Sequence, residues 1–96
     1  MRIELKKFGT TLVSRQEGKE ALAAFQLTLA ELGANENLEI DFSGVLTLSP
    51  GWADEFLSPL LSRLGDKLIL LPSDNLSVQA TLRILEEANK RSFKMK

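Results

Sequence analysis

Residues 38–44 of the chain read Leu-Glu-Ile-Asp-Phe-Ser-Gly. Its apolar residues Leu38, Ile40 and Phe42 alternate with two acidic residues, which is the pattern of a strand that buries one face. The Ser-Gly pair that follows is typical of a turn. The sequence therefore predicts a strand over residues 38–42 whose apolar side chains lie in the core.

Helical patterns lie on both sides of this strand. Residues 15–32 and residues 76–88 carry apolar residues at three- and four-residue spacing, the pattern of a helix with one buried face, and this pattern places Leu76 inward. The first of these helices is expected to begin after a Ser14 cap, and the second after a cap at Ser73, Asp74 or Asn75. Between them, Ser49 and Pro50 indicate a further helix start, because serine caps a helix and proline suits its first turn. The stripe that follows contains Pro59, which either kinks this helix or splits it in two. We therefore predict three main helices.

Three further segments bear on the sheet. At the N-terminus, Ile3 and Leu5 alternate with charged residues, which predicts a half-buried strand. Residues 12–13 suit a short second strand, and the sequence leaves open whether it pairs with the first as a hairpin. The run Leu-Ile-Leu-Leu at residues 68–71 is short and bounded by turn residues, which favours a buried strand. Residues 92–96 show no such pattern and are expected to fray.

The order of these elements indicates the fold class. Strands and helices that alternate along the chain imply crossover connections onto one sheet that is at least partly parallel. A chain of 96 residues has the length of one domain with one core. We therefore predict that residues 1–96 form a single α/β domain with a mixed sheet and three main helices. The pattern leaves open whether the layers number two or three.

The composition disfavours several classes of function. Twelve basic and thirteen acidic residues give a net charge of -1, which offers no general attraction for nucleic acid or an anionic membrane. The chain has no cysteine and no histidine, so it lacks thiolate nucleophiles, sulfur ligands for zinc and the commonest general base. We therefore expect no catalytic residue, no metal site and no cofactor. The charged first eight residues and the lack of a long apolar run predict a cytoplasmic protein without membrane contact.

The densest group of unusual residues joins the strand at 38–42 to the helix start that follows. In an open α/β sheet, ligands and partners are met where strands end and helices begin. A structural explanation competes with this functional one, because Ser-Gly suits a turn, Ser49 suits a cap, and Trp52 lies on the apolar stripe of its helix. Within residues 43–56 we define a candidate partner-binding set: Ser43, Gly44, Ser49, Pro50, Gly51, Trp52, Asp54 and Glu55.

The charged residues of this region have simple explanations. Asp54 and Glu55 follow the expected helix start closely, where the helix dipole favours negative charge, so they make a poor acid/base pair. Arg15 is expected to be solvated. The free N–H groups between Ser49 and Trp52 are an alternative site, because a helix N-terminus can hold an anion.

Several segments carry a resemblance to a known family. Asp41-Phe-Ser-Gly-Val45 and Ser49-Pro-Gly-Trp-Ala-Asp-Glu-Phe56 resemble the STAS-like domain family of unknown function. Val13-Ser-Arg15 followed by Gly18 is similar to the segment before that family's first helix. The family is in turn similar to the STAS domains of bacterial anti-sigma-factor antagonists and sulfate transporters. The resemblance covers most of the chain, from about residue 8 to residue 85.

The resemblance implies a role in signal transduction. It implies a protein-binding surface at the loop leading into the second helix, and a histidine-kinase-like ATPase or a transcriptional regulator as the partner. In the antagonists, the partner kinase phosphorylates a serine at this helix start, and the added charge ends binding. Here Pro50 and Gly51 occupy the corresponding positions, so Ser49 is the nearest candidate for phosphorylation. We therefore expect a non-enzymatic interaction module, with small-molecule or anion binding near Ser49 and Trp52 as the alternative.

Overall fold

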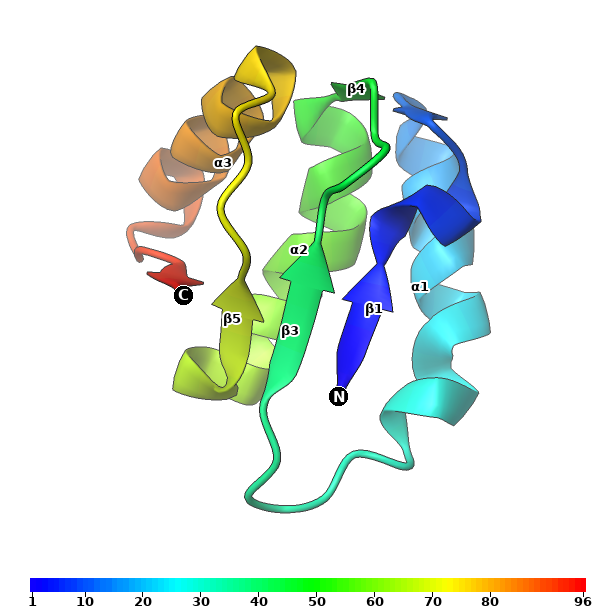
Figure 1. The fold of residues 1–96 in the computed structure, drawn as a ribbon, viewed down its shortest axis with the longest axis vertical. Coiled ribbons are helices and arrows are strands. Elements are labelled where there is room, and N and C mark those ends of the chain that lie inside the picture. Colours follow the sequence, from blue (N-terminus) through cyan, green and yellow to red (C-terminus); the bar gives the residue numbers. More distant parts are fainter.

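The main sheet has four strands, and each of its pairings is parallel. The computed structural model describes all residues from Met1 to Lys96. The strand order is β1-β3-β5-β6, with β1 (Arg2–Glu4), β3 (Leu38–Asp41), β5 (Leu68–Leu70) and β6 (Lys94–Met95). A separate parallel pair, β2 (Thr11–Leu12) and β4 (Thr47–Leu48), lies at one end of the molecule (Figure 1).

Three helices pack on the same side of the main sheet (Figure 1). They are α1 (Arg15–Leu29), α2 (Pro50–Leu64) and α3 (Leu76–Asn89), and the short helical turns η1 (Leu5–Phe8) and η2 (Gly65–Lys67) complete the connections. Each crossover connection adds the next strand at the same edge of the sheet. Because such crossovers share one handedness, all three helices lie on one face. The domain therefore has two layers. None of its helices has the length and apolar character needed to cross a bilayer.

The predicted α/β class with three main helices is confirmed. The strand predicted at residues 38–42 is confirmed as β3, which ends at Asp41; Leu38 and Ile40 are fully buried, and Phe42, directly after the strand, is 3% exposed. The sheet is more uniform than the mixed sheet predicted, because a helix connects each pair of neighbouring strands and helical crossovers join parallel strands. Pro59 does not split α2, which runs unbroken from Pro50 to Leu64.

The N-terminal strands do not form a hairpin. β1 ends at Glu4, and η1 then carries the chain to β2, whose Leu12 lies in register with Leu48 of β4. The backbone N–H of Leu46 also donates to the Thr10 carbonyl, at 2.8 Å. The second predicted strand therefore pairs with a segment more than thirty residues away, which no local pattern encodes.

The prediction that residues 92–96 fray is wrong. Lys94 and Met95 pair with β5 as strand β6, and Phe93 is only 4% exposed. The backbone N–H of Lys96 donates to the Leu70 carbonyl at 3.0 Å, which extends this pairing to the last residue. A strand of two residues is too short to show a period, so its partner strand and the buried Phe93 determine its position.

The core between the sheet and the helices is aromatic at its centre. Trp52 and Phe56 of α2 stack with ring centroids 5.0 Å apart, and Phe56 also contacts Phe8 at 5.3 Å and Phe25 at 5.8 Å. On α1, Gly18 lies against the backbone of Trp52, so that a Cβ atom at residue 18 would be 2.5 Å from the Trp52 carbonyl oxygen. Glycine therefore permits the close approach of α1 to α2.

The other face of the main sheet is open and carries charged side chains. Glu39 of β3 accepts hydrogen bonds from Lys96 Nζ at 2.8 Å and from Arg2 Nε at 3.2 Å. The bond from Lys96, followed by the one from Arg2, holds the pKa of the Glu39 carboxyl below its usual value. Parallel sheets are usually covered on both faces, and these ion pairs give the uncovered face a polar surface instead.

Candidate functional site

The candidate site lies at the end of the molecule where the main strands finish and all three helices begin (Figure 1). Three chain segments form this end, which we call the loop end: residues 10–14, residues 42–49 and residues 71–76. The β2–β4 pair lies within it, so hydrogen bonds of a small sheet hold two of the segments together. The predicted partner-binding set falls partly in this end and partly in α2.

Ser49 is a structural cap for α2, as predicted. Its Oγ accepts a hydrogen bond from the Trp52 N–H at 3.2 Å and donates one to the Val13 carbonyl at 2.9 Å. The Ala53 N–H bonds to the Ser49 carbonyl at 3.1 Å, and Pro50 has no N–H to offer. Gly51 is therefore the only first-turn residue whose N–H is left for a ligand, which makes this helix start a poor anion site.

Asp54 and Glu55 pair with Arg15, which corrects two predictions. Arg15 Nη1 lies 2.9 Å from Asp54 Oδ2 and 3.2 Å from Glu55 Oε1, so Arg15 is not a freely solvated side chain. The carboxylates belong to the second turn of α2, not to its first turn, so Arg15 accounts for their position better than the helix dipole does. The hydrogen bond from Arg15, and then that from Ser58, lowers the pKa of the Asp54 carboxyl. These groups form an ion pair that joins α1 to α2.

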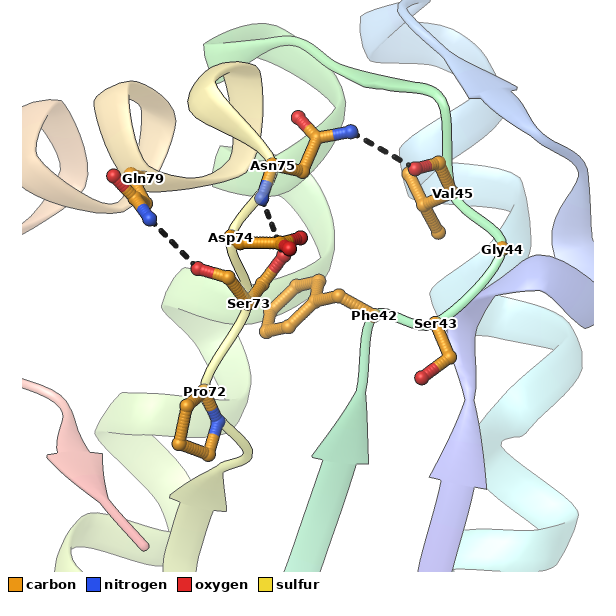
Figure 2. Close-up of a pocket in the computed structure, with 9 residues that line it drawn as sticks. All are labelled: Phe42, Ser43, Gly44, Val45, Pro72, Ser73, Asp74, Asn75 and Gln79. Atoms are coloured by element: carbon orange, nitrogen blue, oxygen red, sulfur yellow. Dashed lines mark hydrogen bonds between the residues drawn. The ribbon is translucent and has the colours of Figure 1, made fainter.

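A pocket of about 590 Å³ opens between the segments that leave β3 and β5 (Figure 2). These two strands are neighbours in a parallel sheet, so their carboxyl ends meet at the same edge. In Figure 2 the Phe42 ring lies between the two segments, and the Ser73 and Asp74 side chains point into the space above it. The lining residues are Phe42, Ser43, Gly44, Val45, Pro72, Ser73, Asp74, Asn75 and Gln79.

Asn75 ties the two sides of this pocket together. Its Oδ1 caps α3 by accepting from the N–H groups of Ser77 at 2.9 Å and Val78 at 3.1 Å. Its Nδ2 donates to the carbonyls of Val45 and Leu46, each at 3.0 Å. One side chain therefore fixes the start of α3 against the segment that leads to β4.

Asp41 shapes the β3 side of the pocket. Its Oδ1 accepts the Ser43 N–H at 2.9 Å, which forms a tight turn directly after the strand. This backbone hydrogen bond is the main cause that lowers the pKa of the Asp41 carboxyl. Gly44 follows with φ of 84°, a left-handed conformation that favours glycine, and it lies against the Lys6 side chain.

Three large apolar side chains at the loop end are exposed. Leu76 is 78% exposed, Leu46 is 68% exposed and Val13 is 49% exposed. The prediction that Leu76 faces the core is wrong, because it is the first residue of α3 and directly follows the Asn75 cap. The backbone of Leu46 lies close to the start of α3, since the Leu46 carbonyl accepts a hydrogen bond from the Asn75 side chain.

The structure divides the predicted partner-binding set. Ser43 and Gly44 are exposed and line the pocket, whereas Ser49, Pro50 and Gly51 are half-buried at the start of α2. Trp52 is 1% exposed and belongs to the core, so it cannot contact a partner in this conformation. The set did not include the exposed residues Leu46 and Leu76, nor the pocket residues that follow β5. The pocket residues that follow β5 do have a sequence signal, because Pro72 and three polar residues directly follow an apolar run.

The structure contains no group of three or more acidic, histidine or cysteine side chains that could hold a metal ion. Comparisons with known proteins give no family: no family model matches the sequence, and neither curated proteins nor solved structures give a significant match. The resemblance to STAS-like domains therefore stays a prediction.

Proposed function

We propose that this protein is a non-enzymatic regulatory module that binds a partner protein through its loop end. The observation that carries the proposal is the exposure of Leu76, Leu46 and Val13 at one end of the domain. Burying apolar surface against a partner gains roughly 25 cal/mol per Å² removed from water. Apolar groups that gather on one exposed surface are typical of interaction sites.

The backbone that presents these side chains is already held in place. The N–H of Leu46 bonds to Thr10, its carbonyl accepts from Asn75, and the Val13 carbonyl accepts from Ser49. A partner would therefore have to order little of this chain on binding, which lowers the entropy cost of association. The adjoining pocket offers space for a partner side chain beside Val45 and Asn75.

The polar groups near the loop end support a binding role over a catalytic one. Ser49 both accepts and donates within the fold, and Asp54 is bonded to Arg15 and Ser58. Phosphorylation of Ser49 would remove the hydroxyl hydrogen that bonds to the Val13 carbonyl. We therefore propose that Ser49 has a structural role and is not a phosphorylation site. The sequence resemblance suggests a kinase-like ATPase or a transcriptional regulator as the partner class, and either suits this surface.

Binding of an anion or small molecule near Ser49 and Trp52 is the second candidate. It has less support, because Gly51 supplies the single uncommitted N–H in the first turn of α2 and Trp52 is buried. The nearby carboxylates of Asp54 and Glu55 would also repel an anion. Their Arg15 partner is already shared between them.

A capture experiment with surface variants tests the proposal. The double variant Leu46→Asp, Leu76→Asp is expected to lose the partner that the native protein retains from its own cell lysate, with affinity at least tenfold lower. The physical reason is that each aspartate would place a charge in an apolar contact. Both side chains are exposed, so the variant should keep the native circular dichroism spectrum and denaturation midpoint.

The matched control is Leu27→Asp. Leu27 is 84% exposed on α1, away from the loop end, so this change adds the same charge at an equally accessible leucine. We expect the control to retain the partner. Equal capture by the native protein and the double variant would contradict the proposal, as would equal loss from the double variant and the control.

A further inference from the structure

The main sheet has an unpaired edge at β6. No strand lies beyond β6 in the sheet order, and Lys96 uses its N–H on the inner side, where it donates to the Leu70 carbonyl at 3.0 Å. Successive residues of a strand direct their backbone groups to opposite sides. The N–H and carbonyl of Met95 therefore point outward, where a further strand could pair with them.

A groove with an apolar floor of Leu82, Phe93 and Met95 and a polar rim runs along this edge, between β6 and α3. It has a volume of about 290 Å³ and is lined by Gln79, Leu82, Arg83, Glu86, Phe93 and Met95. Met95 is in register with Leu70, so its side chain lies on the helix-covered face of the sheet. It is nevertheless 49% exposed, because no further strand covers it. The groove is the place where a side chain from an added strand would pack.

The charges beside this edge are mostly positive. Lys94 and Lys96 precede and follow Met95, so both lie on the open face of the sheet, and Arg83 lies at the groove. Of these, Lys96 pairs with Glu39, and the Glu86 carboxylate in the groove accepts the Phe93 N–H at 2.8 Å. Lys94 and Arg83 form no ion pair, and Glu86 keeps its negative charge because its hydrogen-bond partner is a neutral backbone N–H.

We propose that β6 binds an extended peptide segment of a partner, which adds to the sheet as a fifth strand. One apolar side chain of the peptide fills the α3/β6 groove, and acidic residues directly before and after it lie on the open face near Lys94 and near Lys96, which they would share with Glu39. This alternation follows from the two-residue period of a strand. Backbone hydrogen bonds supply affinity in this mode of recognition, and the groove and lysines supply specificity. The inference does not depend on the exposed side chains of the loop end, although Gln79 lines both this groove and the pocket at the loop end.

The test is an NMR titration of the full chain with the peptide acetyl-Thr-Glu-Leu-Glu-Thr-amide. We expect amide shifts at residues 93–96 and at residues 82–86 that saturate with one affinity. The peptide in which lysine replaces both glutamates should bind at least fivefold more weakly, because it repels the basic edge. Replacing its leucine with glycine should also weaken binding, since the groove is then empty.

Two protein variants complete the test. Lys94→Glu is expected to weaken binding of the glutamate peptide at least fivefold, whereas Lys19→Glu on α1 makes the same charge change at a distant exposed site and should leave it unchanged. The inference is overturned if the glutamate peptide produces no shifts at β6. Equal binding of the glutamate and lysine peptides, or equal effects of the two variants, would overturn it as well.

Discussion

Replacing Trp52 with alanine is expected to lower the free energy of unfolding by about 3–5 kcal/mol. Trp52 is 1% exposed, stacks on Phe56 with centroids 5.0 Å apart and lies 6.0 Å from the Phe8 ring. Truncation removes the transfer free energy of the indole ring and leaves a cavity that a helix and a sheet cannot easily close. Circular dichroism during urea denaturation measures the change, because the variant loses the only tryptophan fluorophore.

Leu27→Ala is the control for this prediction. Leu27 is 84% exposed, and its truncation should change the free energy of unfolding by less than about 0.5 kcal/mol. A loss below about 1 kcal/mol for Trp52→Ala would mean that the indole is not buried between α2 and its neighbours. In that case Trp52 would return as a candidate partner contact.

Gly18→Ala is expected to destabilise the fold by about 1–3 kcal/mol, although alanine favours a helix by roughly 1 kcal/mol over glycine. The added Cβ would lie 2.5 Å from the Trp52 carbonyl oxygen and 3.0 Å from its Cα, both backbone atoms that cannot rotate away. α1 and α2 would therefore have to move apart along their contact. The same urea denaturation experiment gives the magnitude.

Gly33→Ala provides the matched comparison. Around Gly33, the nearest atom to an added Cβ is 3.6 Å away, which is an ordinary van der Waals contact. We expect this variant to unfold within about 0.5 kcal/mol of the native protein, or to be slightly more stable. If Gly18→Ala is as well tolerated as Gly33→Ala, then the close approach of the two helices does not occur.

Much of the fold follows from local patterns in the sequence. The alternation of Leu38, Ile40 and Phe42 places one face of β3 correctly in the core, because a two-residue period has only one way to bury three apolar side chains. The Ser14 and Ser49 caps are also predicted correctly, since each serine accepts a hydrogen bond from an N–H three residues later. A cap can be predicted from the sequence, because it involves only residues that are close together along the chain.

The features that the sequence did not predict depend on distant contacts. The pairing of β2 with β4, and of Lys94 and Met95 with β5, involves strands of two residues whose partners lie far along the chain. A strand this short shows no period. Its position depends on how the longer elements bring the segments together, and that information is not local.

Only part of the candidate site could be predicted, because some of its residues depend on contacts between distant segments. Ser43 and Gly44 were identified because they follow a recognisable strand, and they line the pocket. The spacing of Leu76 fits the apolar stripe of α3 and predicts burial, yet Leu76 is the first residue of the helix, lies beyond its packed turns and is exposed. Asn75 was one of three possible caps, and its second role in holding Leu46 requires the folded chain.

The most direct test of the loop-end proposal is hydrogen–deuterium exchange of the full chain, alone and in complex with the partner that it captures. We predict that binding slows exchange at residues 10–14, 44–49 and 75–77, with little change on the open face of the sheet. Protection confined to α1, to the open face or to residues 93–96 would contradict the account, because the partner would then bind without the exposed Val13, Leu46 and Leu76 side chains.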